Sequence, residues 1–143
     1  MTTENVRHAD FTQEQTVEWV QDQFKKAQKY LAERGIVAEK VISSSSRYIA
    51  PLVAVWKIKA RDRKEYWLIN GDVPTDHATV TAASDARSAL KYFSMQWQLK
   101  ASNIEAAGAR ASATEQKMAA LMTSRAEAIY QLAENDKLWQ EQA

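Results

Sequence analysis

The last third of the chain carries the pattern that most restricts its fold: two long runs in which apolar residues recur every three or four positions. This spacing places apolar side chains on one face of a helix. The first run extends from about Thr81 to Gly108, and the second follows Ser112 and Glu115, a pair typical of a helix N-terminal capping box. Because the connection is short, we expect two antiparallel helices packed as a hairpin. Trp97 falls on the apolar stripe of the first helix and is expected to be buried.

A further helix is predicted over residues 12–34, where apolar residues follow the same spacing. Thr12 and Gln15 fit another capping box, and Gly35 supplies the left-handed residue that commonly ends a helix. The chain therefore begins its ordered part with an amphipathic helix of about six turns.

The middle of the chain reads as a β-hairpin formed by residues 52–60 and 65–70. Trp56 and Lys57 fall on opposite faces, which predicts a core tryptophan that packs on the helices and lysines that face solvent. A lone hairpin is only marginally stable in water, and residues 41–49 are a candidate third strand. The predicted fold class is α+β: an N-terminal helix, an antiparallel β-hairpin of two or three strands, and a C-terminal helical hairpin packed on the sheet.

Length and composition indicate one globular domain over residues 1–143, with residues 1–11 as a flexible N-terminal arm. The chain contains no cysteine, which excludes disulfides and thiolate chemistry within it. No secretory signal is visible, and the longest apolar stretch, residues 49–56, is too short to cross a bilayer. We therefore expect a cytoplasmic protein with no membrane partner.

The charge pattern argues against nucleic-acid binding. The net charge is +1, although residues 36–71 hold seven basic residues against three acidic ones. Basic residues beside aromatic ones are also found on platforms that bind single-stranded nucleic acid. Here the opposite orientations of Trp56 and Lys57 favour a solvated strand surface instead, so we predict no nucleic-acid partner.

The segment 70–77 is the most site-like part of the sequence, because it holds Asp72, Asp76 and His77 within six residues. Carboxylates and an imidazole suit Mn²⁺ or Zn²⁺, but the only other histidine is His8 and the ligands are too few, so we predict no metal. Turn formation is the simpler interpretation, since aspartates stabilise turns through local hydrogen bonds. A ligand-binding loop is the alternative.

Arg47 and Tyr48 form a second candidate, because an arginine can bind an anion or a partner carboxylate. They would complete a small-molecule site if they shared one cavity with Asp72, Asp76 and His77. The sequence holds no phosphate-binding loop, nucleophile elbow, zinc-binding helix or Cys/His ligand array. We therefore predict no catalytic residue and no cofactor.

A set of short motifs lies between residues 47 and 101, within a similarity that spans about residues 14–139. It consists of Arg47-Tyr48, the run Pro51–Lys57, Tyr66-Trp67, the run Gly71–His77, and the run Trp97–Ala101. As a set, these motifs resemble a small bacterial family known only as a domain of unknown function. The resemblance implies a stand-alone, cytoplasmic bacterial protein and supplies no catalytic residues.

Two functions are compatible with these observations. The first is a non-enzymatic protein-interaction or adaptor domain able to self-associate, since catalytic motifs are missing and aromatic residues lie outside the helix stripes. Trp19, Tyr30 and Trp139 would then form an exposed patch. The alternative is a small-ligand-binding protein or minor enzyme that uses the 70–77 loop.

Overall fold

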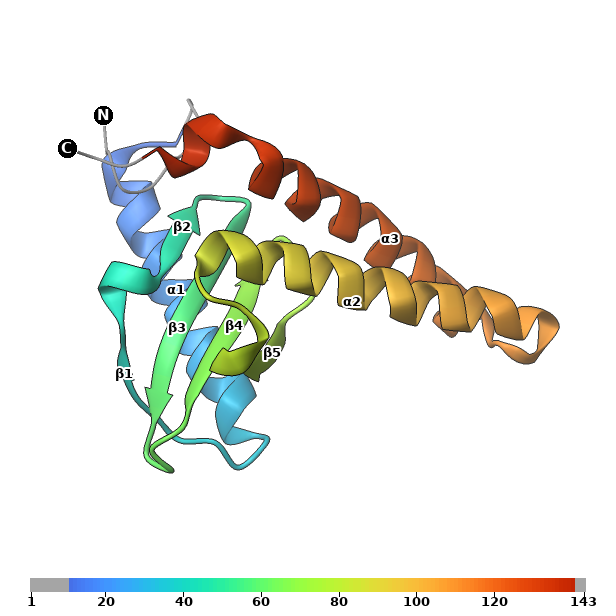
Figure 1. Ribbon diagram of the computed structural model, residues 1–143, viewed down its shortest axis with the longest axis horizontal. Helices are drawn as coiled ribbons and strands as arrows, with labels where there is room; N and C mark the ends of the chain where they lie inside the picture. The colour runs from blue at the N-terminus through green and yellow to red at the C-terminus, as the bar shows by residue number, and fades with distance from the viewer. Residues whose placement is uncertain (1–10, 141–143) are drawn as a thin grey trace.

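The computed structural model describes residues 11–140, so nearly all of the predicted N-terminal arm lies outside the described residues. The described chain forms three long helices and a five-strand antiparallel sheet (Figure 1). In chain order these are α1 (Gln13–Ala32), β1 (Ala38–Val41), β2 (Arg47–Ile49), β3 (Val53–Ala60), β4 (Glu65–Gly71), β5 (Asp76–Thr79), α2 (Ala86–Ala107) and α3 (Ala113–Glu134). Short 3₁₀ turns join several of them.

The sheet lies between two helical layers. Its strand order is β1-β3-β4-β5, and β2 also pairs with β3, so the β3–β4 hairpin forms its centre. Helix α1 covers one face, and the α2–α3 hairpin covers the other (Figure 1). This arrangement confirms the predicted α+β class with a helical hairpin packed on the sheet.

The α1 face of the sheet is built around Trp56. Its ring lies 5.3 Å from Phe24 of α1 and 4.8 Å from Tyr48 of β2, measured between ring centroids. The Trp56 indole N–H donates a 2.9 Å hydrogen bond to Asn70 Oδ1 of β4. The Asn70 amide in turn donates a 2.8 Å bond to the backbone oxygen of Gln23, in the middle of α1. A buried polar bridge therefore joins two strands to this helix.

The opposite face is an apolar core shared by β3, β4, α2 and α3. Trp97 is 1% exposed, as predicted, and belongs to the buried cluster that includes Val55, Trp67 and Ile129. Trp97 therefore packs against one face of the sheet, and Trp56 lies on the other face. The sequence reasoning missed this second face because it treated the hairpin as covered on one side only.

The prediction that Lys57 faces solvent is wrong. Because β3 pairs on both sides, Lys57 lies inside the sheet and on the α2 face. Its ammonium group is 5.6 Å from the centre of the Trp67 ring and 3.7 Å from Glu65 Oε1. A lysine at such a position covers apolar surface with its methylene chain and keeps its charge at the margin.

Both ends of α1 and the start of α3 agree closely with the sequence. Thr12 and Gln15 form the capping box of α1, and Ser112 and Glu115 form that of α3, each with both reciprocal hydrogen bonds present. Gly35 ends α1 with a φ of +76°. In both helices the sequence signal is local, because the same few residues that give the signal also make the bonds.

Three short strands were not clear from the sequence. The candidate third strand at residues 41–49 contains β2 and only the last residue of β1, and a 3₁₀ turn over Ser43–Ser45 separates the two strands. β5 occupies Asp76–Thr79, where the sequence predicted only a turn and then a helix from Thr81; α2 starts at Ala86. Strands this short owe their conformation to pairing with a neighbour, which local composition does not reveal.

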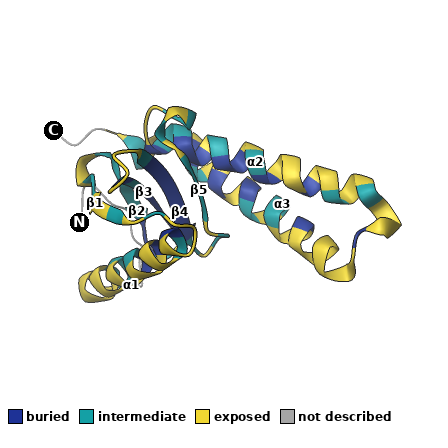
Figure 2. Cartoon of the chain, turned by 90° about the horizontal axis from the view of Figure 1, so that it is seen from below, coloured by how far each residue is buried: buried dark blue, intermediate teal, exposed yellow. Residues whose placement is uncertain are grey.

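The outer half of the α2–α3 hairpin extends beyond the sheet (Figure 2). The last buried residue of α2 is Ala101, and the first buried residue of α3 is Ala119. Between them lies the tip, of which Ala111 alone is buried. The inner half of the hairpin therefore belongs to the core, and the outer half forms a projecting arm.

Candidate functional site

Asp72, Asp76 and His77 point to three different helices rather than into one cavity. Asp72 Oδ1 lies 3.6 Å from Arg125 Nη2 of α3. Asp76 Oδ2 accepts a 3.0 Å hydrogen bond from the indole of Trp97 in α2. His77 Nδ1 and the Tyr30 hydroxyl of α1 share a hydrogen bond of 2.9 Å. These contacts attach the segment 72–77 to all three helices of the described chain.

The alternation of β5 explains why Asp76 and His77 separate. They are consecutive residues of a strand, so their side chains leave on opposite faces of the sheet. Asp76 also accepts a 2.8 Å bond from the backbone N–H of His77, and Lys100 Nζ lies 3.8 Å from its carboxylate. The carboxylate is thus surrounded by three donors of its own chain.

His77 is surrounded by aromatic rings at the edge of the α1 face. The centroid of its imidazole lies 5.4 Å from that of Tyr30 and 6.1 Å from that of Tyr66. Burial lowers the pKa of His77 below its ordinary value, although the charge of Asp76 acts in the opposite direction. Burial, with the nearby Asp76 charge, also raises the pKa of Tyr30. Both groups are therefore held in their neutral forms near pH 7.

Arg47 and Tyr48 are likewise consecutive strand residues that face opposite sides of the sheet. Tyr48 packs against Trp56 on the α1 face with the two rings tilted, and burial raises the pKa of its hydroxyl. The Arg47 guanidinium donates a hydrogen bond to the backbone oxygen of Leu138 and lies 5.6 Å from the centre of the Trp139 ring. The structure does not bring these two residues together with Asp72, Asp76 and His77, and a ligand-binding role for the five stays a prediction.

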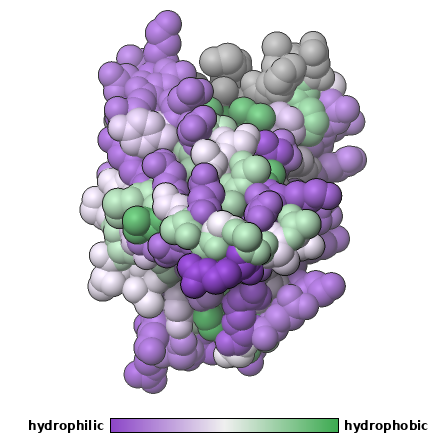
Figure 3. Space-filling model, turned by 90° about the vertical axis from the view of Figure 1, so that its right-hand side faces the viewer, coloured by the Kyte–Doolittle hydropathy of each residue, from purple (hydrophilic) through white to green (hydrophobic). Residues whose placement is uncertain are grey.

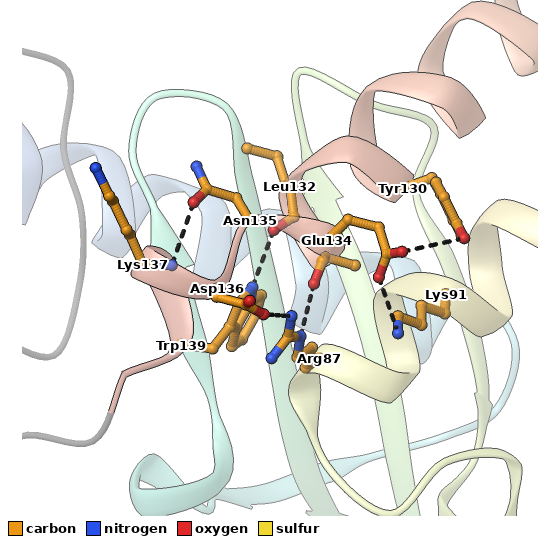
Figure 4. A network of polar contacts seen from close by, with 10 residues as sticks. Arg87, Lys91, Tyr130, Leu132, Glu134, Asn135, Asp136, Lys137 and Trp139 are labelled. Atoms are coloured by element: carbon orange, nitrogen blue, oxygen red, sulfur yellow. Dashed lines mark hydrogen bonds and ion pairs between the residues drawn. The ribbon is translucent and has the colours of Figure 1, made fainter.

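Trp139 is held in place by the network at the C-terminal end of α3 (Figure 4). Its indole donates a 2.9 Å bond to the backbone oxygen of Leu132. Arg87 of α2 donates to the backbone oxygen of Ala133 at 2.6 Å and to Asp136 at 2.5 Å, which neutralises the negative end of the α3 dipole. The chain after α3 is thereby folded back onto the α2–α3 core.

The expected exposed patch of Trp19, Tyr30 and Trp139 does not form. All three are half-buried. Trp19 and Tyr30 pack against the α1 face core, whereas Trp139 packs against the core on the opposite face. Aromatic residues off the main helix stripe fill the margins of the two cores here.

Residues 11–140 contain neither a cluster of metal ligands nor a helix that could span a membrane. No group of three or more His, Cys, Asp or Glu side chains in this part of the chain could hold a metal ion. No helix within it is long and apolar enough to cross a membrane. His8, the second histidine considered above, lies outside the described residues.

A match to a family model covers residues 13–139, nearly the whole described chain, and the family is the Domain of unknown function (DUF4826). The chain belongs to this family. The resemblance drawn from the sequence motifs is thereby confirmed. No curated protein and no solved structure matches the chain.

A groove between the sheet and α3 was missed by the sequence reasoning; it has a volume of about 410 Å³ and is here called the Arg125 groove. Its apolar lining consists of Leu52, Val53, Val73, Ala128, Ile129 and Leu132. Its polar lining consists of Asp72, Arg125, Gln131 and Asn135. One sequence signal did point to it, because Arg125 interrupts the apolar stripe of α3 between Met122 and Ile129.

Proposed function

We propose that this chain is a non-enzymatic protein-interaction domain whose binding surface is the projecting arm formed by the outer halves of α2 and α3. The observation that carries the proposal is the distribution of exposed apolar side chains. Eight large apolar residues are exposed in residues 11–140, and three of them lie on the outer halves of α2 and α3: Leu99, Met118 and Leu121. Met95 and Tyr130 are exposed on the inner halves of the same two helices.

The exposure is substantial at positions where a helix could easily carry polar residues. Met95 is 54% exposed and Leu99 is 53% exposed, and they lie one turn apart on α2. On α3, Leu121 is 40% exposed. Figure 3, which looks toward the end of the molecule where the arm projects, shows hydrophobic surface distributed between hydrophilic side chains. Such mixed surfaces resemble non-obligate interfaces more than an uncovered core.

The simplest partner is a second copy of the chain. Two helical hairpins can pack face to face as a four-helix bundle, and a two-fold axis makes the same surface complementary to itself. Residues 86–134 carry six basic and four acidic residues, so no strong like-charge repulsion opposes this approach. We further propose, from the family resemblance, that the domain acts in the bacterial cytoplasm.

Sedimentation velocity over a range of concentrations tests the proposal. Wild-type protein should self-associate reversibly, and Leu99→Glu or Leu121→Glu should shift it to monomer, because a buried unpaired carboxylate opposes association. Val17→Glu is the matched control: Val17 is 46% exposed but lies on α1, so its replacement should leave association unchanged. A wild-type protein that stays monomeric at every concentration, or equal effects of the three variants, would contradict this assignment.

A further inference from the structure

The walls of the Arg125 groove are fixed by backbone contacts. Gly71 has a φ of +119°, and a Cβ placed there would lie 2.7 Å from the Leu52 oxygen, so only glycine lets the end of β4 approach this closely. The next residue, Asp72, donates its backbone N–H to the same oxygen at 2.8 Å. Leu52, Asp72 and Val73 therefore form one preformed wall, and α3 forms the other.

Arg125 has hydrogen-bonding capacity that its own chain does not use. Its side chain is only 33% exposed. Within residues 11–140, its sole polar contact is the 3.6 Å approach to Asp72, which is longer than a hydrogen bond. A guanidinium carries five N–H donors in a planar fork that matches a carboxylate. In the free protein these donors are therefore open to water, and a ligand anion can replace that water on the guanidinium.

Asp72 leaves the N–H donors of Arg125 available to a ligand. Its side chain is 71% exposed, so water satisfies the carboxylate and the pair with Arg125 is of the weak, solvent-screened kind. A ligand carboxylate could displace it at little cost. A ligand cation would instead have to compete with water for Asp72 while leaving the Arg125 donors unpaired, so the groove favours an anion.

The remaining lining is apolar and placed for a short hydrocarbon chain. Ala128, Ile129 and Leu132 follow Arg125 at spacings of three, four and seven, which places them along the same side of α3. Val53 and Val73 line the facing side. A small, mostly apolar cavity with a few convergent polar groups is the usual form of a ligand site.

We propose that the Arg125 groove binds a small apolar monocarboxylate, with the carboxylate on the Arg125 guanidinium and the hydrocarbon chain between α3 and the Leu52–Val73 wall. This site is separate from the projecting arm, so it does not depend on the proposed protein-interaction function.

Isothermal titration calorimetry with hexanoate, octanoate and decanoate as probes tests the assignment. Binding should be saturable, and each added methylene should tighten it by up to about fourfold until the groove is filled. Octanol and octylamine share the chain of octanoate but lack the carboxylate. Both should bind at least about tenfold more weakly than octanoate, because neither pairs with the guanidinium fork.

Two variants place the ligand in the groove. Arg125→Gln should weaken octanoate at least about tenfold, whereas Arg110→Gln, at the tip of the hairpin, should leave it unchanged. Ala128→Phe fills the groove from an exposed helix position and should block octanoate while the circular dichroism spectrum stays that of the wild type. Octanoate binding no tighter than that of octanol, or octanoate binding retained in both Arg125→Gln and Ala128→Phe, would overturn the proposal.

Discussion

The two faces of the central hairpin β3–β4 are both buried, but they are closed in different ways. The α2–α3 face carries a cluster of thirteen buried residues, and the polar groups bonded to Trp67 and Trp97 lie at its border. The α1 face carries a cluster of six, with the polar Asn70 in its interior. The first face gains its stability mainly from apolar area, and its hydrogen bond between sheet and helix, from Trp97 to Asp76, lies at the border. The second face has its hydrogen bond between sheet and helix, from Asn70 to the backbone oxygen of Gln23, in the interior.

The largest expected effect is on the apolar face. Trp97→Ala should lower the free energy of unfolding by about 3–5 kcal/mol, because the lost indole leaves a cavity that its neighbours close only partly. Chemical denaturation measures the change. Val17→Ala, at an exposed position of α1 outside the proposed binding surface, is the control and should change stability by less than about 0.5 kcal/mol. A loss of under about 1 kcal/mol for Trp97→Ala would show that α2 packs by another face.

On the polar face, Asn70→Ala should cost about 1–3 kcal/mol, because the buried Trp56 indole N–H then has no acceptor. A double-mutant cycle with Trp56→Phe isolates this contribution, since phenylalanine has no N–H to leave unpaired. In the Trp56→Phe background, Asn70→Ala should cost less. An equal cost in both backgrounds would mean that Asn70 acts only through Gln23 and packing.

The smallest effect concerns His77, which fastens β5 to α1. Its pKa is lowered in the folded state, so near and below the ordinary value of 6.5 the unfolded chain binds more protons than the folded one. The contribution to stability is therefore complete above the unfolded pKa and is lost as the pH falls toward the folded pKa. His77→Gln should flatten this part of the stability profile. A wild-type profile that is flat in this window would contradict the assignment.

The parts of the fold that the sequence predicted are those specified by neighbouring residues. The capping pairs Thr12–Gln15 and Ser112–Glu115 and the spacing around Trp97 each carry their information within one or two turns. The second buried face of β3 was also visible in principle, because Val53–Trp56 is a continuous apolar run, which is typical of a strand buried on both sides.

The candidate site was harder to predict because its geometry depends on pairing between distant segments. Asp76 and His77 look like one cluster only while β5 is taken for a loop; once it pairs with β4, they must face opposite ways. The Arg125 groove combines residues from the β2–β3 turn, the β4–β5 turn and α3. The only local sequence signal for the groove was Arg125, a charged residue within an apolar helix stripe.

The length of the α2–α3 arm can change without any change in the body of the protein. Each helix has 22 residues, and the tip between them, Gly108–Arg110, takes no part in either core. Inserting seven residues into each helix near the tip would lengthen the arm by about 10 Å while keeping the same helix faces in register. Evolution or design can therefore change how far the arm projects without changing the residues that stabilise the fold.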